Sequence, residues 1–401
     1  MSGEIVPRPS APGRPSAHEV AERARRVAED ARQLADREPY TGNGPRGLRD
    51  PVARFREGPA LDPRTQPIAI VLAGGGARGA YQAGVVRFLA EIGTPISALS
   101  GASIGALNAA ILAAAPSLTE GARRLVELWS QVARTVAESP FGTGALSDST
   151  LTQYLNLPHH LTSPVLRPGF LEDLLLANVD VQALRAGPPL WVSTFPAVDL
   201  DFGMLLRGFV PGAARIGPLR AEEGLRLGWA VDVVRGMVFK EPSTWIKVND
   251  LPPEAMHDAI LSSAALPLVL PPRSVGGKLY RDGGLGDNVP VGALCRQAGC
   301  RRVVVVHLES LPLLNPNHYP ELDIVEVIPS KPVSPDVPLG WLASLLDMSP
   351  RRIAELAELG YADARQQLGD HWRREAAAQV CTFLDGFRHD AVAELDEPRD
   401  R

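Results

Sequence analysis

Short apolar runs that end at glycine mark where the ordered part of the chain begins. Residues 68–72, Ile-Ala-Ile-Val-Leu, are continuously apolar and lead into a row of glycines, which is typical of a strand buried on both faces of a parallel sheet. The pattern that follows predicts a helix over about 78–92, a second strand over 96–99 and a helix from residue 103. This strand–helix–strand–helix order predicts a right-handed crossover in a parallel sheet.

Further apolar segments predict that the sheet continues along the chain. We expect strands at 190–195, 244–248, 302–308 and 322–328, and helices at 256–265, 351–368 and 372–387. The consecutive valines at 303–306 are a strong strand signal, because β-branched residues favour strands. The predicted fold class is α/β. A mostly parallel sheet is sandwiched by helices in three layers, helices follow at the C-terminus, and the site lies at the carboxyl ends of the strands.

The first 66 residues differ in composition from the rest. They hold nine of the 37 prolines, so we predict that 1–66 is a flexible or loosely docked extension with one helix over 16–37. Residues 67–310 are predicted to form the main domain, and 311–401 a strand and helices that pack on it. Within the main domain, 200–243 mixes apolar residues with arginines, which fits either an interfacial lid at a lipid surface or a core helix with solvated arginines.

Composition narrows the choice of partners. The 401 residues carry a net charge of −5 without a long Lys/Arg block, which argues against nucleic acid as the main partner. No apolar run approaches the roughly 20 residues of a membrane span, and no basic start leads into an apolar stretch. We therefore expect a cytoplasmic protein and leave a peripheral membrane contact open. Three cysteines, Cys295, Cys300 and Cys381, predict buried reduced thiols rather than disulfides or a metal site.

A glycine-rich loop stands between the first strand and the first helix. Its residues are Gly74, Gly75, Gly76, Ala77, Arg78 and Gly79. Backbone N–H groups of such a loop, at a helix N-terminus, can stabilise the oxyanion of acyl transfer. The same glycines fit the G-x-G-x-x-G pattern of dinucleotide sites. That pattern needs an acidic residue about 20 positions on, whereas residues 99–103 read Leu-Ser-Gly-Ala-Ser.

A G-x-S-x-G sequence occupies the turn from the second strand into the next helix. It reads Gly101-Ala102-Ser103-Ile104-Gly105, and its small residues allow the sharp bend that exposes a nucleophilic serine. For this motif by itself, a helix N-cap role for Ser103 is the alternative. The glycine loop one strand–helix unit earlier favours the nucleophile, because both turns can face the same edge of the sheet.

A serine nucleophile needs a base, and no histidine stands in a recognisable catalytic context. His257 falls on a predicted amphipathic helix and His307 ends a buried strand, so we predict that each is structural or solvent-facing. Asp282 is the better candidate, because the two glycines that follow it permit a close approach of its carboxylate to Ser103. For Asp282 and Gly283 taken by themselves, an ordinary Asp-Gly turn is the alternative. Asp287 is a weaker candidate for the base.

Together these motifs resemble the three signature blocks of the patatin-like phospholipases, in the family's order. The blocks are the glycine loop 74–79, the serine turn 101–105 and Asp282-Gly283-Gly284. Residues 259–267 and Asn288-Val289-Pro290 are similar to the stretches on either side of the third block, and 349–365 is similar to the C-terminal helix of bacterial members. The resemblance covers about 67–368, although no family block falls within 200–243.

The resemblance implies a Ser–Asp dyad of Ser103 and Asp282 that works without a histidine. The oxyanion hole that it implies lies in the loop residues Gly74, Gly75, Gly76, Arg78 and Gly79. Within this loop the N–H groups of Gly75 and Gly76 would donate, and Arg78 would help to shape the loop.

The predicted function is a serine acyl-hydrolase that cleaves fatty-acyl esters of phospholipids or other lipids through an acyl-enzyme. We expect no metal, no organic cofactor and no calcium loop. An acyltransferase, which passes the same acyl group to an alcohol or a thiol, is the nearest alternative. A non-catalytic lipid-binding protein with the same fold is the alternative from a different class.

Overall fold

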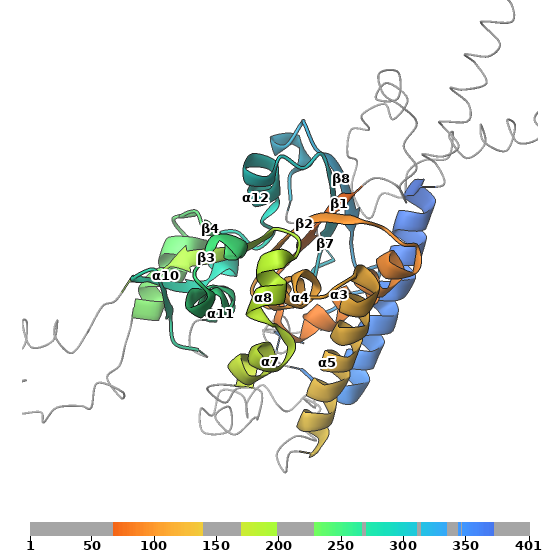
Figure 1. The fold of residues 1–401 in the computed structure, drawn as a ribbon, viewed down its shortest axis with the longest axis horizontal. Helices are drawn as coiled ribbons and strands as arrows, with labels where there is room; N and C mark the ends of the chain where they lie inside the picture. The colour runs from red at the N-terminus through yellow and green to blue at the C-terminus, as the bar shows by residue number, and fades with distance from the viewer. Residues whose placement is uncertain are drawn as a thin grey trace, which may run out of the picture. The chain divides into compact units, whose positions relative to one another are not determined.

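The computed structural model describes residues 67–138, 170–198, 228–266, 270–310, 314–334, 344–345 and 347–372 (Figure 1). Residues Pro63–Leu368 form one compact unit, and Met1–Asp62 with Gly369–Arg401 form a second. The predicted extension 1–66 lies outside the described residues, and so does nearly all of the helix predicted over 372–387. Of the segment 200–243, the structure describes 228–243.

One sheet of eight strands forms the centre of the unit Pro63–Leu368. Its strands are β1 (Ile68–Leu72), β2 (Ile96–Ala102), β3 (Leu190–Pro196), β4 (Thr244–Lys247), β5 (Arg273–Val275), β6 (Lys278–Asp282), β7 (Arg302–Val306) and β8 (Asp323–Val327). Hydrogen-bonded neighbours follow the path β5-β6-β3-β2-β1-β7-β8, with β6 and β2 pairing with successive residues of β3, and β4 also pairs with β3. Strands β1, β2, β3, β7 and β8 pair in parallel, whereas the β3–β4, β3–β6 and β5–β6 pairs are antiparallel. The prediction of a mostly parallel sheet is confirmed.

Burial on both faces explains why the central strands are apolar throughout. Every residue of β1 and β7 is buried. On one face, Val71, Val303 and Val305 belong to a core cluster with the short helix α12 (Val291–Ala293). Because neighbouring residues of a strand point to opposite faces, the other residues of β1 and β7 face the second layer of helices.

Helices α4 (Ile104–Ala113) and α11 (Pro253–Ser263) cover that second face. All residues of α4 are buried, and α4 contacts β1, β2 and β3, while α11 contacts β3, β5 and β6. Around them pack α3 (Gly79–Glu91), α5 (Leu118–Glu138), α7 (Phe170–Asn178) and α8 (Val181–Ala186) (Figure 1). Helices therefore lie on both faces of the sheet, as the sequence predicts.

The C-terminal helix predicted over 351–368 is present and packs closely on α3. Residues 350–368 are helical. A Cβ atom on Gly84 would lie 1.9 Å from the carbonyl oxygen of Ala357, and one on Gly360 would lie 2.0 Å from that of Tyr81. A glycine in each helix therefore lets the two backbones touch, which fixes α3 and the loop that precedes it.

Candidate active site

The register of the sheet places two strands end to end along one edge of β3. Strand β4 pairs with residues 191–194 of β3, and β2 pairs with residues 190–193. Strand β6 pairs with residues 194–196. A strand has only two edges, so β2 must occupy the edge opposite β4. Because Thr194 pairs with both β4 and β6, these two strands must also lie on opposite edges of β3. Strand β6 therefore shares the edge of β3 that β2 occupies, and it lies beyond the end of β2.

This arrangement brings the predicted nucleophile and base together. Ala102, the last residue of β2, pairs with Ser193, and Asp282, the last residue of β6, pairs with the next residue, Thr194. Strand β2 runs parallel to β3 and β6 runs antiparallel, so the two strands point toward each other. Ser103 follows Ala102 directly and therefore adjoins Asp282 across the gap between the strand ends.

Ser103 stands on a strained turn between β2 and α4. Its φ of 52° and ψ of −126° are rare for a residue with a side chain. The turn is closed by glycines: a Cβ atom on Gly101 would lie 2.4 Å from the Gly105 carbonyl oxygen, and one on Gly105 would lie 2.1 Å from that of Leu72. The Ser103 N–H donates a hydrogen bond to Ser263 Oγ at 3.0 Å, which holds the turn in place.

The Asp282 carboxyl is buried at the end of β6, with 3% of the residue exposed. Its Oδ1 accepts a hydrogen bond from the Gly284 N–H at 2.8 Å, while its buried Oδ2 has no partner at ordinary hydrogen-bond distance among the described residues. Burial raises the pKa of Asp282 from 3.8 to about 6, against smaller lowering effects of the Ser103 hydroxyl and the Gly284 N–H. One carboxyl oxygen is therefore free to take a proton beside the Ser103 hydroxyl.

The glycine loop after β1 lies directly against Ser103. A Cβ atom on Gly74 would lie 3.0 Å from the Ser103 Cβ and 2.3 Å from Asn288 Oδ1. Gly76 has a φ of +57°, and a Cβ atom there would lie 2.3 Å from the Leu345 carbonyl oxygen. Both positions therefore require glycine, one for space and the other also for its backbone conformation.

The N–H groups of this loop fall into two classes. The Gly74 N–H donates to the Asn288 carbonyl oxygen at 3.3 Å, and the Gly79 N–H bonds to carbonyl groups within the loop. The N–H groups of Gly75 and Gly76 have no acceptor among the described residues. Of the predicted oxyanion-hole residues, Gly75 and Gly76 therefore keep free donors, whereas Gly74 and Gly79 use theirs to build the loop.

Arg78 braces the glycine loop from within the protein. The residue is 3% exposed, and its Nε donates to the Gly75 carbonyl oxygen at 3.1 Å. Its Nη1 donates to the Leu308 carbonyl oxygen at 3.0 Å and forms an ion pair with Glu309. Because these partners already occupy the guanidinium, Arg78 acts on the loop backbone.

The rival bases are engaged elsewhere. Both carboxyl oxygens of Asp287 accept hydrogen bonds, one from Trp245 Nε1 at 2.8 Å and one from the Val289 N–H at 3.2 Å. His257 contacts a backbone carbonyl oxygen at 3.0 Å, and the buried His307 pairs with a glutamate of β8 at 3.0 Å. The structure does not bring any of these three residues to Ser103.

Two residues outside the predicted site hold its parts together. Asn288 Nδ2 donates to the Gly74 carbonyl oxygen at 3.2 Å, in addition to the backbone bond between the two residues. Ser263 accepts the Ser103 N–H from the end of α11. The motifs give no chemical reason to single out either residue, because asparagine and serine are common in loops and at helix ends.

The cysteines differ from the sequence-based expectation. Cys295 and Cys300 are free and half-buried, whereas the sequence predicts buried thiols, and Cys381 lies outside the described residues. Cys295 Sγ donates to Glu321 Oε1 at 2.6 Å, and burial with this contact raises the pKa of the thiol to about 11. Among the described residues, no group of three or more His, Cys, Asp or Glu side chains is placed to hold a metal ion. No described helix is long and apolar enough to cross a membrane.

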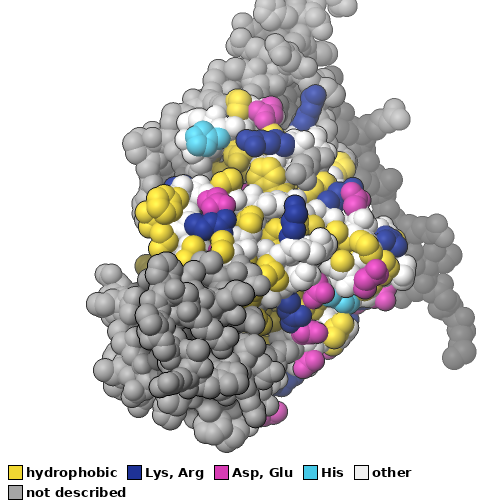
Figure 2. All heavy atoms as spheres, turned by 90° about the vertical axis from the view of Figure 1, so that its left-hand side faces the viewer, with side chains coloured by type: hydrophobic (Ala, Val, Ile, Leu, Met, Phe, Trp, Pro, Cys, Tyr) yellow, Lys and Arg dark blue, Asp and Glu magenta, His cyan; other side chains and the backbone are white. Residues whose placement is uncertain are grey.

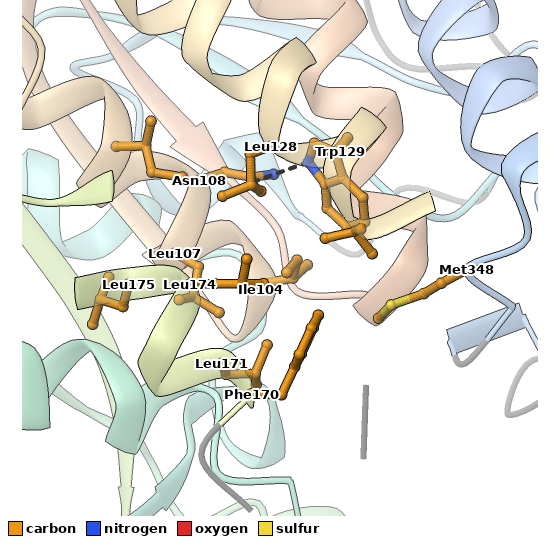
Figure 3. A pocket seen from close by; sticks show the side chains of 12 residues that line it. Ile104, Leu107, Asn108, Leu128, Trp129, Phe170, Leu171, Leu174, Leu175 and Met348 are labelled. Atoms are coloured by element: carbon orange, nitrogen blue, oxygen red, sulfur yellow. Dashed lines mark hydrogen bonds between the residues drawn. The ribbon is translucent and has the colours of Figure 1, made fainter. Parts of the chain in front are cut away.

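An apolar pocket opens beside the turn that carries Ser103 (Figure 3). Its lining comes from α4, α5, α7 and Met348. Ile104 and Leu107 line it from α4, and Phe170 lines it from the start of α7. Trp129 Nε1 donates to Asn108 at 3.3 Å, so the indole N–H of the lining has a partner.

Helix α10 (Gly228–Met237) turns a charged residue inward and apolar residues outward. Asp232 is fully buried and pairs with Arg281 of β6 at 2.8 Å. On the outer side of the helix, Val231 and Val234 are 37% and 44% exposed, and Val238 and Phe239 in the turn after the helix are 66% and 73% exposed. Figure 2, which views the side where α10 lies in Figure 1, shows apolar side chains interspersed with basic and acidic ones. The described part of the segment 200–243 therefore presents apolar surface next to the strand that ends at the site.

Known proteins similar to this chain are much longer than it is. Patatin-like phospholipase domain-containing protein 7 of Rattus norvegicus is 35% identical over 180 residues, which cover 43% of this chain and 13% of that protein. Lysophospholipase NTE1 of Cryptococcus neoformans var. neoformans is 26% identical over 282 residues, which cover 68% and 14%. The chain thus spans only a small part of the length of these relatives. The human GIVD cytosolic phospholipase A2 structure matches with a TM-score of 0.39 and 11% identity, covering 91% of this chain and 67% of that one.

The family model of the patatin-like phospholipases matches residues 70–294. This stretch begins within β1 and continues past the Asp282 turn into the helix after α12, so it contains the glycine loop, the serine turn and Asp282. It covers more than half of the 401 residues. The chain therefore belongs to the patatin-like phospholipase family.

Proposed function

We propose that this protein is a lipid acyl hydrolase with Ser103 as its nucleophile and Asp282 as its base. The observation that carries the proposal is the end-to-end approach of β2 and β6, which places Ser103 and a buried carboxyl at the same point on the edge of β3. Family membership supports a lipid ester as the substrate class. The dyad, the acyl-enzyme and the choice of lipid belong to the proposal.

In the first half-reaction, the Asp282 carboxylate accepts the proton of Ser103 Oγ as this oxygen attacks the ester carbonyl carbon. The carbonyl electrons move onto oxygen and form a tetrahedral oxyanion. When the oxyanion collapses, the bond to the leaving alcohol breaks and that oxygen takes the proton from Asp282. The fatty acyl group then remains on Ser103.

In the second half-reaction, Asp282 accepts a proton from water as the water oxygen attacks the acyl-serine. Collapse of this second oxyanion returns the proton to Ser103 Oγ and releases the fatty acid. A pKa of about 6 suits a group that must both accept and return a proton near neutral pH.

The oxyanion in both steps would be held by the free N–H groups of Gly75 and Gly76. These donors are fixed before the reaction, because Gly74 and Arg78 anchor the loop on either side. Donors of this kind each contribute on the order of 10²–10³ in rate.

The pocket beside Ser103 is the proposed site for the acyl chain. Its lining is apolar, and Ile104 follows the nucleophile directly. The exposed apolar residues of α10 and of the turn after it support a peripheral contact of the protein with the lipid surface that supplies this substrate.

Labelling with a fluorophosphonate probe and hydrolysis of a lipid panel test the proposal. The wild-type protein should form one covalent adduct and release fatty acid, and Ser103→Ala should do neither while keeping its far-UV CD spectrum and Tm. Ser130→Ala, which changes an exposed serine of α5, is the matched control and should behave as wild type. An adduct on another residue, or fatty-acid release by Ser103→Ala, would refute the nucleophile. Transfer of the acyl group to an added alcohol in preference to water would identify an acyltransferase.

A further inference from the structure

The direction of a backbone N–H is set by the carbonyl group that shares its peptide bond. A trans peptide is planar, and its C=O and N–H point in opposite directions. All described peptide bonds are trans. Whatever holds the Gly74 carbonyl therefore also orients the Gly75 N–H, and whatever holds the Gly75 carbonyl orients the Gly76 N–H. These N–H groups are the free donors among the predicted oxyanion-hole residues.

A different side chain holds each of these carbonyl groups. Asn288 Nδ2 donates to the Gly74 carbonyl oxygen at 3.2 Å, and Arg78 Nε donates to the Gly75 carbonyl oxygen at 3.1 Å. Both donors are side-chain groups, so neither of these two bonds belongs to the backbone hydrogen bonding of a helix or a sheet. The Gly75 carbonyl oxygen also accepts the backbone N–H of Arg78 at 3.2 Å. Among the described residues, the Asn288 bond alone therefore orients the Gly75 N–H, whereas two bonds orient the Gly76 N–H.

Asn288 is tied to both halves of the site. Its own carbonyl oxygen accepts the Gly74 N–H at 3.3 Å, so Asn288 binds both the N–H and the carbonyl oxygen of Gly74. Its Oδ1 lies where Cβ atoms on Gly74 and Gly284 would be, at 2.3 Å and 2.8 Å. Gly284 in turn donates to Asp282. Asn288 therefore sets the glycine loop against the turn that carries the carboxyl.

We propose that Asn288 is a positioning residue that aims the Gly75 N–H at the oxyanion by holding the Gly74 carbonyl. Asn288 does not touch the reacting atoms. It acts on the transition state, where charge develops on oxygen, and it has little effect on substrate binding. This inference rests on the proposed function, because it assumes that acyl transfer occurs at Ser103.

Asn288→Ala removes the side-chain bond and keeps the backbone bond to Gly74. We expect kcat on a p-nitrophenyl acyl ester to fall at least about 10-fold, toward the 10²–10³-fold loss typical of one oxyanion donor, with KM nearly unchanged. Affinity for a long-chain trifluoromethyl ketone, whose adduct with Ser103 carries the same oxyanion, should fall in proportion to kcat/KM. A residue that only stabilises the fold would not link these two quantities.

Asn249→Ala is the matched control. Asn249 is a structural asparagine that accepts the Leu190 N–H at 2.7 Å and donates to the Leu184 carbonyl oxygen at 2.8 Å. This variant should lower Tm and leave kcat per folded molecule and ketone affinity at the wild-type values. If Asn288→Ala does not fold, Asn288→Asp replaces it, because this near-isostere removes the Nδ2 donor and should show the same proportional losses.

The outcomes separate the inference from the function beneath it. If the wild-type protein forms no fluorophosphonate adduct at Ser103, the proposed function fails. If the adduct forms and Asn288→Ala keeps kcat within about threefold of wild type, the positioning role is refuted and the dyad stands. Loss of kcat without a matching loss of ketone affinity would also refute the positioning role.

Discussion

Replacing Asp282 with asparagine should inactivate the protein and stabilise it at the same time. Burial raises the pKa of this carboxyl from 3.8 to about 6, so ionising it costs more free energy in the folded protein than in the unfolded chain. The shift is about two units, and each unit corresponds to about 1.4 kcal/mol, which gives about 3 kcal/mol. Asparagine has nearly the same shape, and its Oδ1 can still accept the Gly284 N–H, but it carries no charge.

The pH dependence gives this prediction its sign. The folded protein binds the Asp282 proton more tightly than the unfolded chain does. The stabilising contribution of this carboxyl is therefore present in full below about pH 4 and is lost as the pH rises through about 6. Asp282→Asn lacks this titration. Its free energy of unfolding, relative to wild type, should increase by up to about 3 kcal/mol between about pH 4 and about pH 8.

Urea unfolding of both proteins across this pH range measures the difference directly, because the titrations of all other groups cancel. Asp250→Asn, at a largely exposed carboxyl, is the control for the same exchange at the surface. A difference between Asp282→Asn and wild type that stays constant with pH, or that shifts in favour of the wild type as the pH rises to about 8, would show that burial does not raise this pKa. The reasoning that makes Asp282 a usable base would then fail.

Two further predictions concern catalysis and the lipid surface. The wild-type kcat/KM for a soluble ester should fall about tenfold per pH unit below an apparent pKa of about 6, because Asp282 must be ionised to accept the Ser103 proton. A pH profile that stays flat down to about pH 4.5 would exclude Asp282 as the base. Phe239→Ser should weaken sedimentation with phosphatidylcholine vesicles and leave turnover of the soluble ester unchanged, because Phe239 is 73% exposed. The control Val126→Ser changes a 39% exposed residue of α5. Equal effects of the two variants would argue against a membrane contact through the turn after α10.

The sequence predicts those parts of the fold that local pattern determines. The apolar run 68–72 matches β1 residue for residue, and the strand predicted at 190–195 differs from β3 by one residue. The valines at 303–306 lie in β7. The glycine loop and the serine turn are also local features, since each is a strand end, a few small residues and a helix start. Such patterns need no information about distant residues.

Features that depend on distant contacts could not be predicted in the same way. The short antiparallel strands β5 and β6 have mixed polarity, and only the pairing of β6 with β3 and of β5 with β6 makes them strands. In α10 the charged Asp232 faces the protein interior, because it pairs with Arg281, which lies 49 residues further along the chain. The sequence pattern of a helix suggests that the charged side faces solvent, and a buried ion pair reverses this expectation.

The direction of β6 has a chemical consequence that a purely parallel sheet would not provide. In a parallel sheet all strand ends at one edge point the same way, so a base from a neighbouring strand would stand beside the nucleophile with both groups open to solvent. Here β6 arrives from the opposite direction, and its last side chain ends in the sheet interior at the tip of β2. Asp282 is therefore desolvated by the strand pairing that positions it. Desolvation raises its pKa to about 6 and makes it a stronger base than an exposed aspartate. The same contact that positions the proposed base thus also raises its pKa, and the fold gives up stability to keep a charge there.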